Sequence, residues 1–250
     1  MEQNKHKQLG YVQIFLCYGI ISALFYFRIM RANYLIVEQD IYLALNLIVI
    51  GALCFLFGLV INNWSLKSSG NPVPIVKIMI AVIALVLADV IVSAIIARNA
   101  GTAAPIAGGW LAFRAVLNSG ATNNIFGFAL PAWTMLFSIP VGIFVYRYAC
   151  LSGKANKRLL AVFVILYMAA SLTGYLNLLM HGGSFSFISA RNFIDFGIRD
   201  IYRYITMLTG IHLICVILPR PKFNLRSNLR DYFRHEADNI KALVSRNKAE

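Results

Sequence analysis

The chain has 250 residues, of which 59% are hydrophobic and only 13% are charged. Soluble domains usually carry about 25% charged residues, so this composition excludes an ordinary water-soluble fold and indicates a membrane protein. The formal net charge is +13, but the Lys and Arg residues fall mostly between or after the apolar runs. That distribution favours topology signals and anionic lipid headgroups over nucleic acid.

Apolar runs long enough to cross a membrane recur along the chain, since a hydrocarbon core of about 30 Å takes about 20 helical residues. The first is followed by Arg28 and Arg31 rather than by a small-residue cleavage site, which predicts a retained helix and not a signal peptide. The full set is 9–27, 41–61, 78–97, 129–146, 159–180 and 204–218, the last beginning nearer Ile201. We therefore expect an all-α polytopic membrane protein with six transmembrane helices.

Two polar segments interrupt these runs. Residues 98–128 are too polar and too rich in glycine to cross a membrane, and they predict a small β-containing segment between the third and fourth helices. Residues 181–200 form a polar loop between the fifth and sixth helices. The positive-inside rule predicts that both termini are cytoplasmic and that both polar segments lie on the outer face.

The chain divides into three parts: an N-terminal extension at 1–77, a central domain at 78–218 and a basic tail at 219–250. In the tail, apolar residues recur at helical spacing between basic residues, at Leu229, Phe233, Ile240 and Val244. This pattern predicts an amphipathic helix on the inner membrane surface, and a solvated or partner-bound helix fits it equally well. The four cysteines have no paired spacing and are predicted to be small core residues.

Four local patterns follow one another in the central domain. Asp89 lies in mid-span, Asn118-Ser119-Gly120-Ala121 precedes Phe126-Gly127, a basic turn leads into a helix ending SLTGYLNLL, and His181-Gly182-Gly183 precedes Phe187-Ile188. In this order they resemble the lipoprotein signal peptidase family (signal peptidase II), with its motifs D-Q-x-x-K, N-x-G-A-A-F, G-N-x-x-D-R and G-x-V-V-D-F-I. The N-terminal extension and the tail lie outside the resemblance.

The resemblance implies four membrane helices and two catalytic aspartates near the outer surface, which cleave the signal peptide of lipid-modified prolipoproteins. This sequence departs from the motifs at several positions. Ser93 replaces the lysine of the first motif, Asn177 and Leu178 stand at the D-R of the third, and Ser186 and Tyr204 stand at the two catalytic aspartates. An aspartic peptidase needs two carboxylates that share a proton. The departures therefore predict that the catalytic dyad is lost.

Other residues offer a rearranged site. Phe193-Ile194-Asp195-Phe196 is locally a better match to V-V-D-F, but no Asp or Glu occurs between Ile201 and Leu229 to complete a dyad. Asp200 lies one helical turn before Tyr204, and His181 would face it across the loop. These three residues, Asp195, Asp200 and His181, are the fallback catalytic candidates.

Three functions follow as alternatives. The first is a non-catalytic relative that binds membrane lipid and a lipidated or helical membrane segment. Its cleft would be lined by Asp89, Arg114, Asn118, Gly120 and Asn177. The second is an active aspartic-type endopeptidase with a rearranged site, and the third is a transport or assembly component whose extension and tail contact partner proteins. We expect no cofactor and no metal, because His181 and His212 belong to no recognisable ligand motif.

Overall fold

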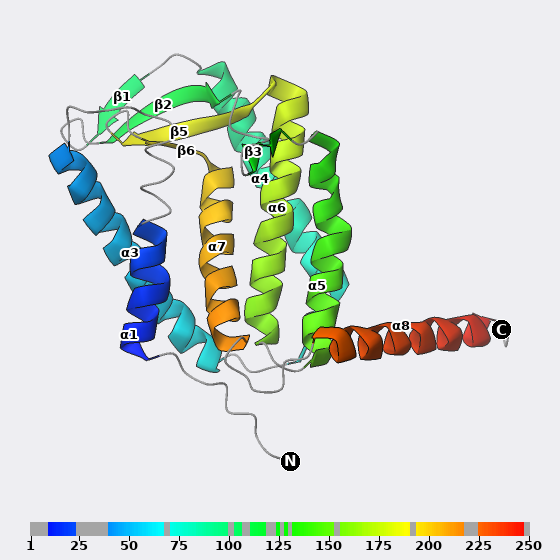
Figure 1. Ribbon diagram of the computed structural model, residues 1–250. Coiled ribbons are helices and arrows are strands. Elements are labelled where there is room, and N and C mark those ends of the chain that lie inside the picture. The colour runs from blue at the N-terminus through cyan, green and yellow to red at the C-terminus, as the bar shows by residue number, and fades with distance from the viewer. Residues whose placement is uncertain are drawn as a thin grey trace.

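The computed structural model describes residues 10–23, 40–67, 71–99, 103–106, 111–118, 124–125, 128–129, 132–152, 156–190, 194–217 and 225–247. The described chain is mostly helical, with a bundle of helices capped at one end by a small sheet (Figure 1). This arrangement is the frame that holds the candidate site.

The bundle is built from α4 (Ile75–Arg98), α5 (Ser138–Ser152), α6 (Lys157–His181) and α7 (Ile198–Ile217), with the 3₁₀ helix η3 (Ala132–Phe137) leading into α5. Three helical stretches in the described residues are long and apolar enough to cross a membrane, namely Ile75–Arg98, Trp133–Leu151 and Lys157–His181. They correspond to the third, fourth and fifth expected spans. The structure thus supports a membrane protein with three candidate spans among its described residues.

Helix α6 is the centre of the bundle, and its sequence sets both of its ends. The side chain of Asn156 accepts hydrogen bonds from the backbone N–H groups of Arg158 and Leu159, each at 3.0 Å, and so caps the N-terminus. At the other end Gly182 has φ of 71°, and its N–H donates to the carbonyl of Leu178 at 2.9 Å. This left-handed residue favours glycine, and it turns the chain into the sheet.

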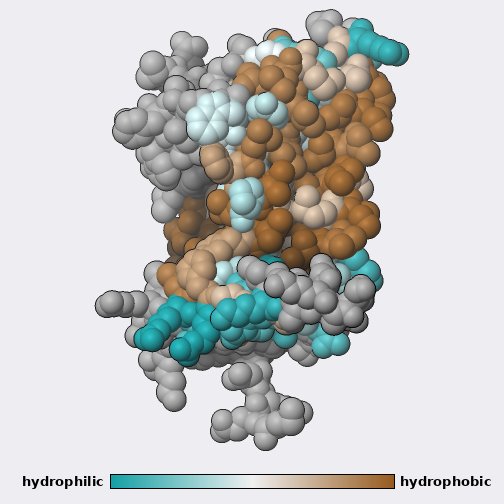
Figure 2. Space-filling model, turned by 90° about the vertical axis from the view of Figure 1, so that its right-hand side faces the viewer, coloured by the Kyte–Doolittle hydropathy of each residue, from teal (hydrophilic) through white to brown (hydrophobic). Residues whose placement is uncertain are grey.

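The main apolar core lies where α4, α5 and α7 pack around α6. Ile78, Val82, Val164 and Met168 are among its most buried members. Yet α4 is apolar on its opposite face as well, where it exposes Val76, Ile80, Ile83, Leu87, Ile91 and Ile95. A helix that is apolar all round has no polar face to offer water and is typical of a membrane span. Figure 2 shows the same pattern on one face of the molecule, with hydrophobic residues over the middle and hydrophilic ones gathered at the lower end.

The N-terminal extension contributes α1 (Tyr11–Ile14), the π-helix η1 (Phe15–Ile20) and α3 (Asp40–Lys67). These elements pack against one another and against α7, with Ile14, Tyr18, Cys54 and Leu208 at the centre of the contact. A Cβ at Gly58 would lie 2.7 Å from the ring of Tyr18, so only glycine allows this approach. Among the described side chains, the apolar stretches of these helices are Tyr11–Ala23 and, within the longer α3, Ile48–Trp64. Residues 24–27 of the first expected span lie outside the described residues.

The sheet has four antiparallel strands in the order β1-β2-β5-β6: β1 (Ala103–Ile106), β2 (Leu111–Asn118), β5 (Ser184–Ala190) and β6 (Ile194–Phe196). A second pair joins β3 (Asn124–Ile125) and β4 (Phe128–Ala129). The expected β-structure between the third and fourth helices is therefore present. Residues 181–200 were wrongly expected to be a loop, because two of their segments satisfy their backbone groups by pairing with β2 and with each other.

The tail forms α8 (Leu225–Asn247), as its helical spacing predicted. In Figure 1 this helix begins beside the end of α5, at the end of the bundle opposite the sheet, and projects away from the bundle at a steep angle to α5.

Candidate functional site

A buried carboxylate and a buried amide meet between two spans of the bundle. Asp89 on α4 is 3% exposed and Asn177 on α6 is 1% exposed. The Nδ2 of Asn177 donates a hydrogen bond to the Oδ2 of Asp89 at 2.8 Å. Because an ionisable group inside a membrane span is costly unless it is paired, this bond helps to fix α4 against α6. It also joins two positions of the peptidase motifs, Asp89, which matches the first motif, and Asn177, which departs from the third.

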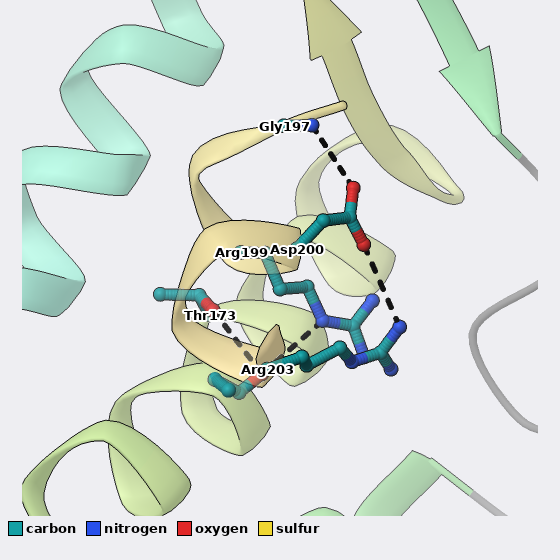
Figure 3. A network of polar contacts seen from close by, with 6 residues as sticks. Thr173, Gly197, Arg199, Asp200 and Arg203 are labelled. Carbon is teal, nitrogen blue, oxygen red and sulfur yellow. Dashed lines mark hydrogen bonds and ion pairs between the residues drawn. The ribbon is translucent and has the colours of Figure 1, made fainter. Parts of the chain in front are cut away.

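The first turn of α7 adds a buried guanidinium to the same region. Arg199 is 3% exposed, and its Nε donates to the backbone carbonyl of Ala170 at 3.1 Å. The hydroxyl of Thr173 donates to the same carbonyl at 3.2 Å (Figure 3). A Cβ at Gly174 would collide with the guanidinium of Arg199. Glycine at this position therefore makes the space that the arginine occupies.

Asp200 fixes the start of α7. Its Oδ2 accepts a hydrogen bond from the backbone N–H of Gly197 at 2.9 Å, while its Oδ1 lies 3.8 Å from the Nη1 of Arg203 (Figure 3). The hydroxyl of Tyr202 donates to the carbonyl of Leu85 on α4 at 3.1 Å. An acidic side chain that caps the first turn in this way stabilises the helix N-terminus. The start of α7 is thus held by contacts within its own first turn, with α4 and with α6.

Opposite charges balance in this region, which we call the polar cluster and define as Asp89, Asn177, Arg199, Asp200 and Arg203. The guanidinium and the backbone N–H of Arg199 attract the carboxylate of Asp89, whereas Asp200 repels it. The polar cluster thus contains two carboxylates and two guanidinium groups. Two buried atoms of the cluster have no hydrogen-bond partner, the Oδ1 of Asn177 and the Nη1 of Arg199. One is an acceptor and the other a donor, so together they have the capacity to bind a polar ligand.

His181 lies at the C-terminal end of α6, next to the sheet. Its ring meets that of Phe185 edge to face, with centroids 5.0 Å apart, and its Nε2 is buried without a hydrogen-bond partner. The structure therefore places His181 against an aromatic ring of β5. Among the described side chains, no hydrogen bond or ion pair connects it with Asp200.

The two positions that match the family's catalytic aspartates lie on different elements. Ser186 is on β5, opposite Val116 of β2, and is 1% exposed. Tyr204 is half-buried on α7, one turn after Asp200.

The sheet register brings another pair of family matches together, because Asn118 at the end of β2 lies opposite Ser184, directly after the glycine turn. Arg114 lies opposite Ala103, and Asp195 lies opposite Ser189. The side chains of Arg114, Asn118 and Asp195, and the whole of Gly120, lie outside the described part of the structure.

Sequence analysis missed the role of Arg199. The sequence pattern that could have predicted this role lies in α6, where the small residues Ala170 and Gly174 are four positions apart and so share one face of the helix. Small residues at this spacing allow a close approach between membrane helices. Here the space receives a side chain from α7. Among the described residues, no group of three or more His, Cys, Asp or Glu side chains has an arrangement that would hold a metal ion.

Fold and site together define a helical membrane protein with a buried polar cluster beneath a small sheet. The chain is similar to a solved bacterial membrane enzyme, determined by the in meso method at 2.3 Å resolution, with 18% identity and a TM-score of 0.41 over 59% of this chain and 94% of that one. A second bacterial membrane enzyme, determined by the same method at 1.9 Å, gives 19% identity and a TM-score of 0.39 over 56% of this chain and 92% of that one. No family model and no curated protein matches the chain.

Proposed function

We propose that this chain is a non-catalytic relative of the lipoprotein signal peptidases that binds a lipidated or helical membrane segment without cleaving it. In this proposal it is an inner-membrane protein with six spans and cytoplasmic termini. The bound segment lies where the sheet meets α4, α6 and α7. The membrane-facing apolar surface of α4 and the three candidate spans support a site within the bilayer.

The observation that carries the proposal is the way in which the carboxylates of the polar cluster are engaged. Asp89 accepts a hydrogen bond from Asn177, and Asp200 accepts one from the backbone of its own helix. Aspartic peptidase chemistry needs two carboxylates that share one proton around a water molecule. Here an amide stands beside Asp89 at hydrogen-bond distance, which is the arrangement of a structural pair.

Binding is supported by the two unpartnered atoms of the polar cluster. The Oδ1 of Asn177 accepts hydrogen bonds and the Nη1 of Arg199 donates them, and both atoms are buried. An extended or partly unwound peptide segment presents one N–H donor and one carbonyl acceptor per residue. Such a segment would satisfy both atoms in a region where water is scarce.

The test uses the full chain in lipid vesicles with a synthetic lipid-modified prolipoprotein segment that carries a fluorophore. We expect saturable binding with no cleaved product. Asn177→Ala should weaken binding at least about tenfold, equivalent to about 1.4 kcal/mol. Asn99→Ala is the matched control, because Asn99 is an exposed asparagine at the end of α4 and donates to the carbonyl of Ile95. Cleavage by the wild-type protein that is lost in Asp89→Asn or Asp200→Asn would overturn the proposal.

A second candidate function, an active aspartic-type endopeptidase, is favoured by one observation. Asp89 of α4 and Asp200 of α7 are the two carboxylates of the polar cluster. If they form a working pair, Asp89→Asn and Asp200→Asn should each abolish cleavage of a prolipoprotein, while Ser186→Ala leaves it intact. Asp195→Asn tests the alternative carboxylate. Unchanged activity in all three aspartate variants would exclude this mechanism, and complementation of a bacterial strain that lacks the lipoprotein signal peptidase would measure the activity in cells.

A further inference from the structure

Helix α8 is fixed to the last two turns of α5 by an aromatic group and an ion pair. Tyr232 is 8% exposed, and its ring lies edge to face with Phe144 at 5.2 Å and with Tyr148 at 6.0 Å between centroids. Beside it, the Nη2 of Arg147 lies 2.7 Å from the Oε2 of Glu236. These contacts set both the level of α8 along the bundle and its rotation about its own axis.

In this orientation, one face of α8 is directed towards the apolar surface of the bundle. Phe233 is 60% exposed, and its ring lies 6.4 Å from that of Phe144 with 29° between the planes. Phe144 lies one turn further into the bundle than Tyr148 and two turns before the end of α5 at Ser152. Phe233 therefore lies on the side of α8 that faces the hydrophobic middle of the molecule. Helical spacing places positions 229, 240 and 244 on the same face.

The basic and acidic residues of α8 lie on different sides of the helix relative to this face. Arg230, Arg234 and Lys241 are exposed and share one side of the helix, next to the face of Phe233, by their spacing of four and seven residues. Asp231 and Asp238, also exposed, share the side that points away from Phe233. Glu236, the third acidic residue of the helix, is engaged by Arg147 of α5. One side next to the apolar face thus carries basic residues, and the two exposed acidic residues, Asp231 and Asp238, lie furthest from that face.

We propose that α8 lies in the headgroup layer of an anionic bilayer leaflet, with the face of Phe233 towards the acyl chains and Arg230, Arg234 and Lys241 against lipid phosphates. Two observations favour lipid over water or a protein as the occupant. Helix α8 begins beside the last turns of α5, a candidate span, and projects away from the bundle at that level (Figure 1). Its exposed Phe233 also lies beside Phe144, which belongs to the apolar stretch of the same span. Basic side chains beside an apolar face are what an interfacial helix needs, since they reach the phosphates while the apolar residues enter the acyl layer.

Two exposed alanines of α8 provide a matched test. Ala237 lies close to the face of Phe233 and Ala242 lies opposite it, by helical spacing. The full chain carrying Ala237→Cys or Ala242→Cys is reconstituted in vesicles containing phosphatidylglycerol and reacted with a charged, water-soluble maleimide. Labelling after solubilisation in detergent gives the total reactive thiol, and the unsubstituted protein gives the background of the four native cysteines.

We expect the cysteine at 242 to react at least about fivefold faster than the cysteine at 237 in anionic vesicles. The difference should shrink in phosphatidylcholine vesicles, whose headgroups carry no net charge, and after the combined change of Arg230, Arg234 and Lys241 to Gln, which removes the charges that an anionic leaflet attracts. Equal reactivity in anionic vesicles would show a solvated helix and overturn the proposal. Protection of both positions would show a helix enclosed by a second protein chain, which overturns it too.

Discussion

Two regions of this protein bury polar side chains in an apolar bundle, and they do so in different ways. The polar cluster beneath the sheet contains charges, and its carboxylates accept hydrogen bonds at 2.8 and 2.9 Å. The interface between the N-terminal extension and α7 buries Tyr18, Ser22 and His212, each 2% exposed or less. There the hydroxyls of Tyr18 and Ser22 and the Nδ1 of His212 have no hydrogen-bond partner.

The difference follows from the cost of burying a charge. A neutral hydroxyl or imidazole without a partner costs about 1–3 kcal/mol in protein mutational data, whereas an isolated ion costs far more. A buried charged group therefore needs at least one polar partner, as the carboxylate of Asp89 and the Nε of Arg199 have, while a neutral interface tolerates groups with none if the packing around them is close. At the extension, ring packing of Tyr18 beside His212, with centroids 6.1 Å apart, and a contact of 2.8 Å between the thiols of Cys17 and Cys215 provide that packing. All four cysteines are free, as the sequence predicted.

The largest effect should come from removing the buried guanidinium of the polar cluster. Arg199→Ala removes a guanidinium that is 3% exposed, together with its hydrogen bond to the carbonyl of Ala170, and leaves the negative charges of the cluster less balanced. Leaving a buried charge uncompensated costs about 3–5 kcal/mol. The free energy of unfolding in detergent micelles measures this loss. Arg203→Ala is the matched control four residues on, where a half-exposed side chain at 3.8 Å from Asp200 should contribute about 0–1 kcal/mol. Equal losses in the two variants would mean that the cluster is not a charge-balanced unit.

A smaller loss is expected from the amide that holds Asp89. Asn177→Ala removes a hydrogen bond to a charged group and should lower the free energy of unfolding by about 1.5–3 kcal/mol. Asn99→Ala, which removes an exposed side chain-to-backbone bond at 3.0 Å, should change it by less than about 0.5 kcal/mol. If Asn177→Ala proves as mild as Asn99→Ala, the bond between α4 and α6 does not stabilise the bundle.

The sequence predicted the parts of this structure that depend on local pattern. The spans around Asp89 and Asn177 follow from the length of the apolar runs, and the β-structure after α4 follows from the polar, glycine-containing segment between two of them. The helix of the tail follows from the spacing of its apolar residues. The strands at 184–190 and 194–196 were missed because β5 pairs with β2, which lies some 70 residues earlier in the chain, and β6 pairs with β5 in turn. The role of Arg199 was missed for a similar reason, since the space it fills is made by Gly174 of another helix. Long-range contacts of this kind leave little trace in a single sequence.

The orientation of α8 about its own axis also depends on long-range contacts that the sequence did not reveal. Helical spacing at Leu229 and Phe233 predicted an amphipathic helix but left its surroundings open between a membrane surface, solvent and a partner. What fixes its face is the contact between Tyr232 and two residues of α5, Phe144 and Tyr148. That contact depends on where α5 ends, which the sequence of the tail does not contain.

The smallest effect should come from the neutral interface. Tyr18→Phe deletes only a hydroxyl that has no partner, and it keeps the ring that packs against Gly58. Removal of an unsatisfied buried group can be neutral or stabilising, so the free energy of unfolding should change by less than about 0.5 kcal/mol. Tyr18→Ala is the contrasting variant, because emptying a fully buried aromatic site costs about 3–5 kcal/mol.

A loss above about 1 kcal/mol in Tyr18→Phe would mean that the hydroxyl has a partner, such as a buried water shared with His212. A double-mutant cycle with His212→Leu would then measure the coupling between the two side chains. If coupling is found, the extension is held to α7 by a polar bridge, and the contrast with the charged cluster disappears. If it is absent, close packing alone is enough to bury three neutral polar groups at this interface.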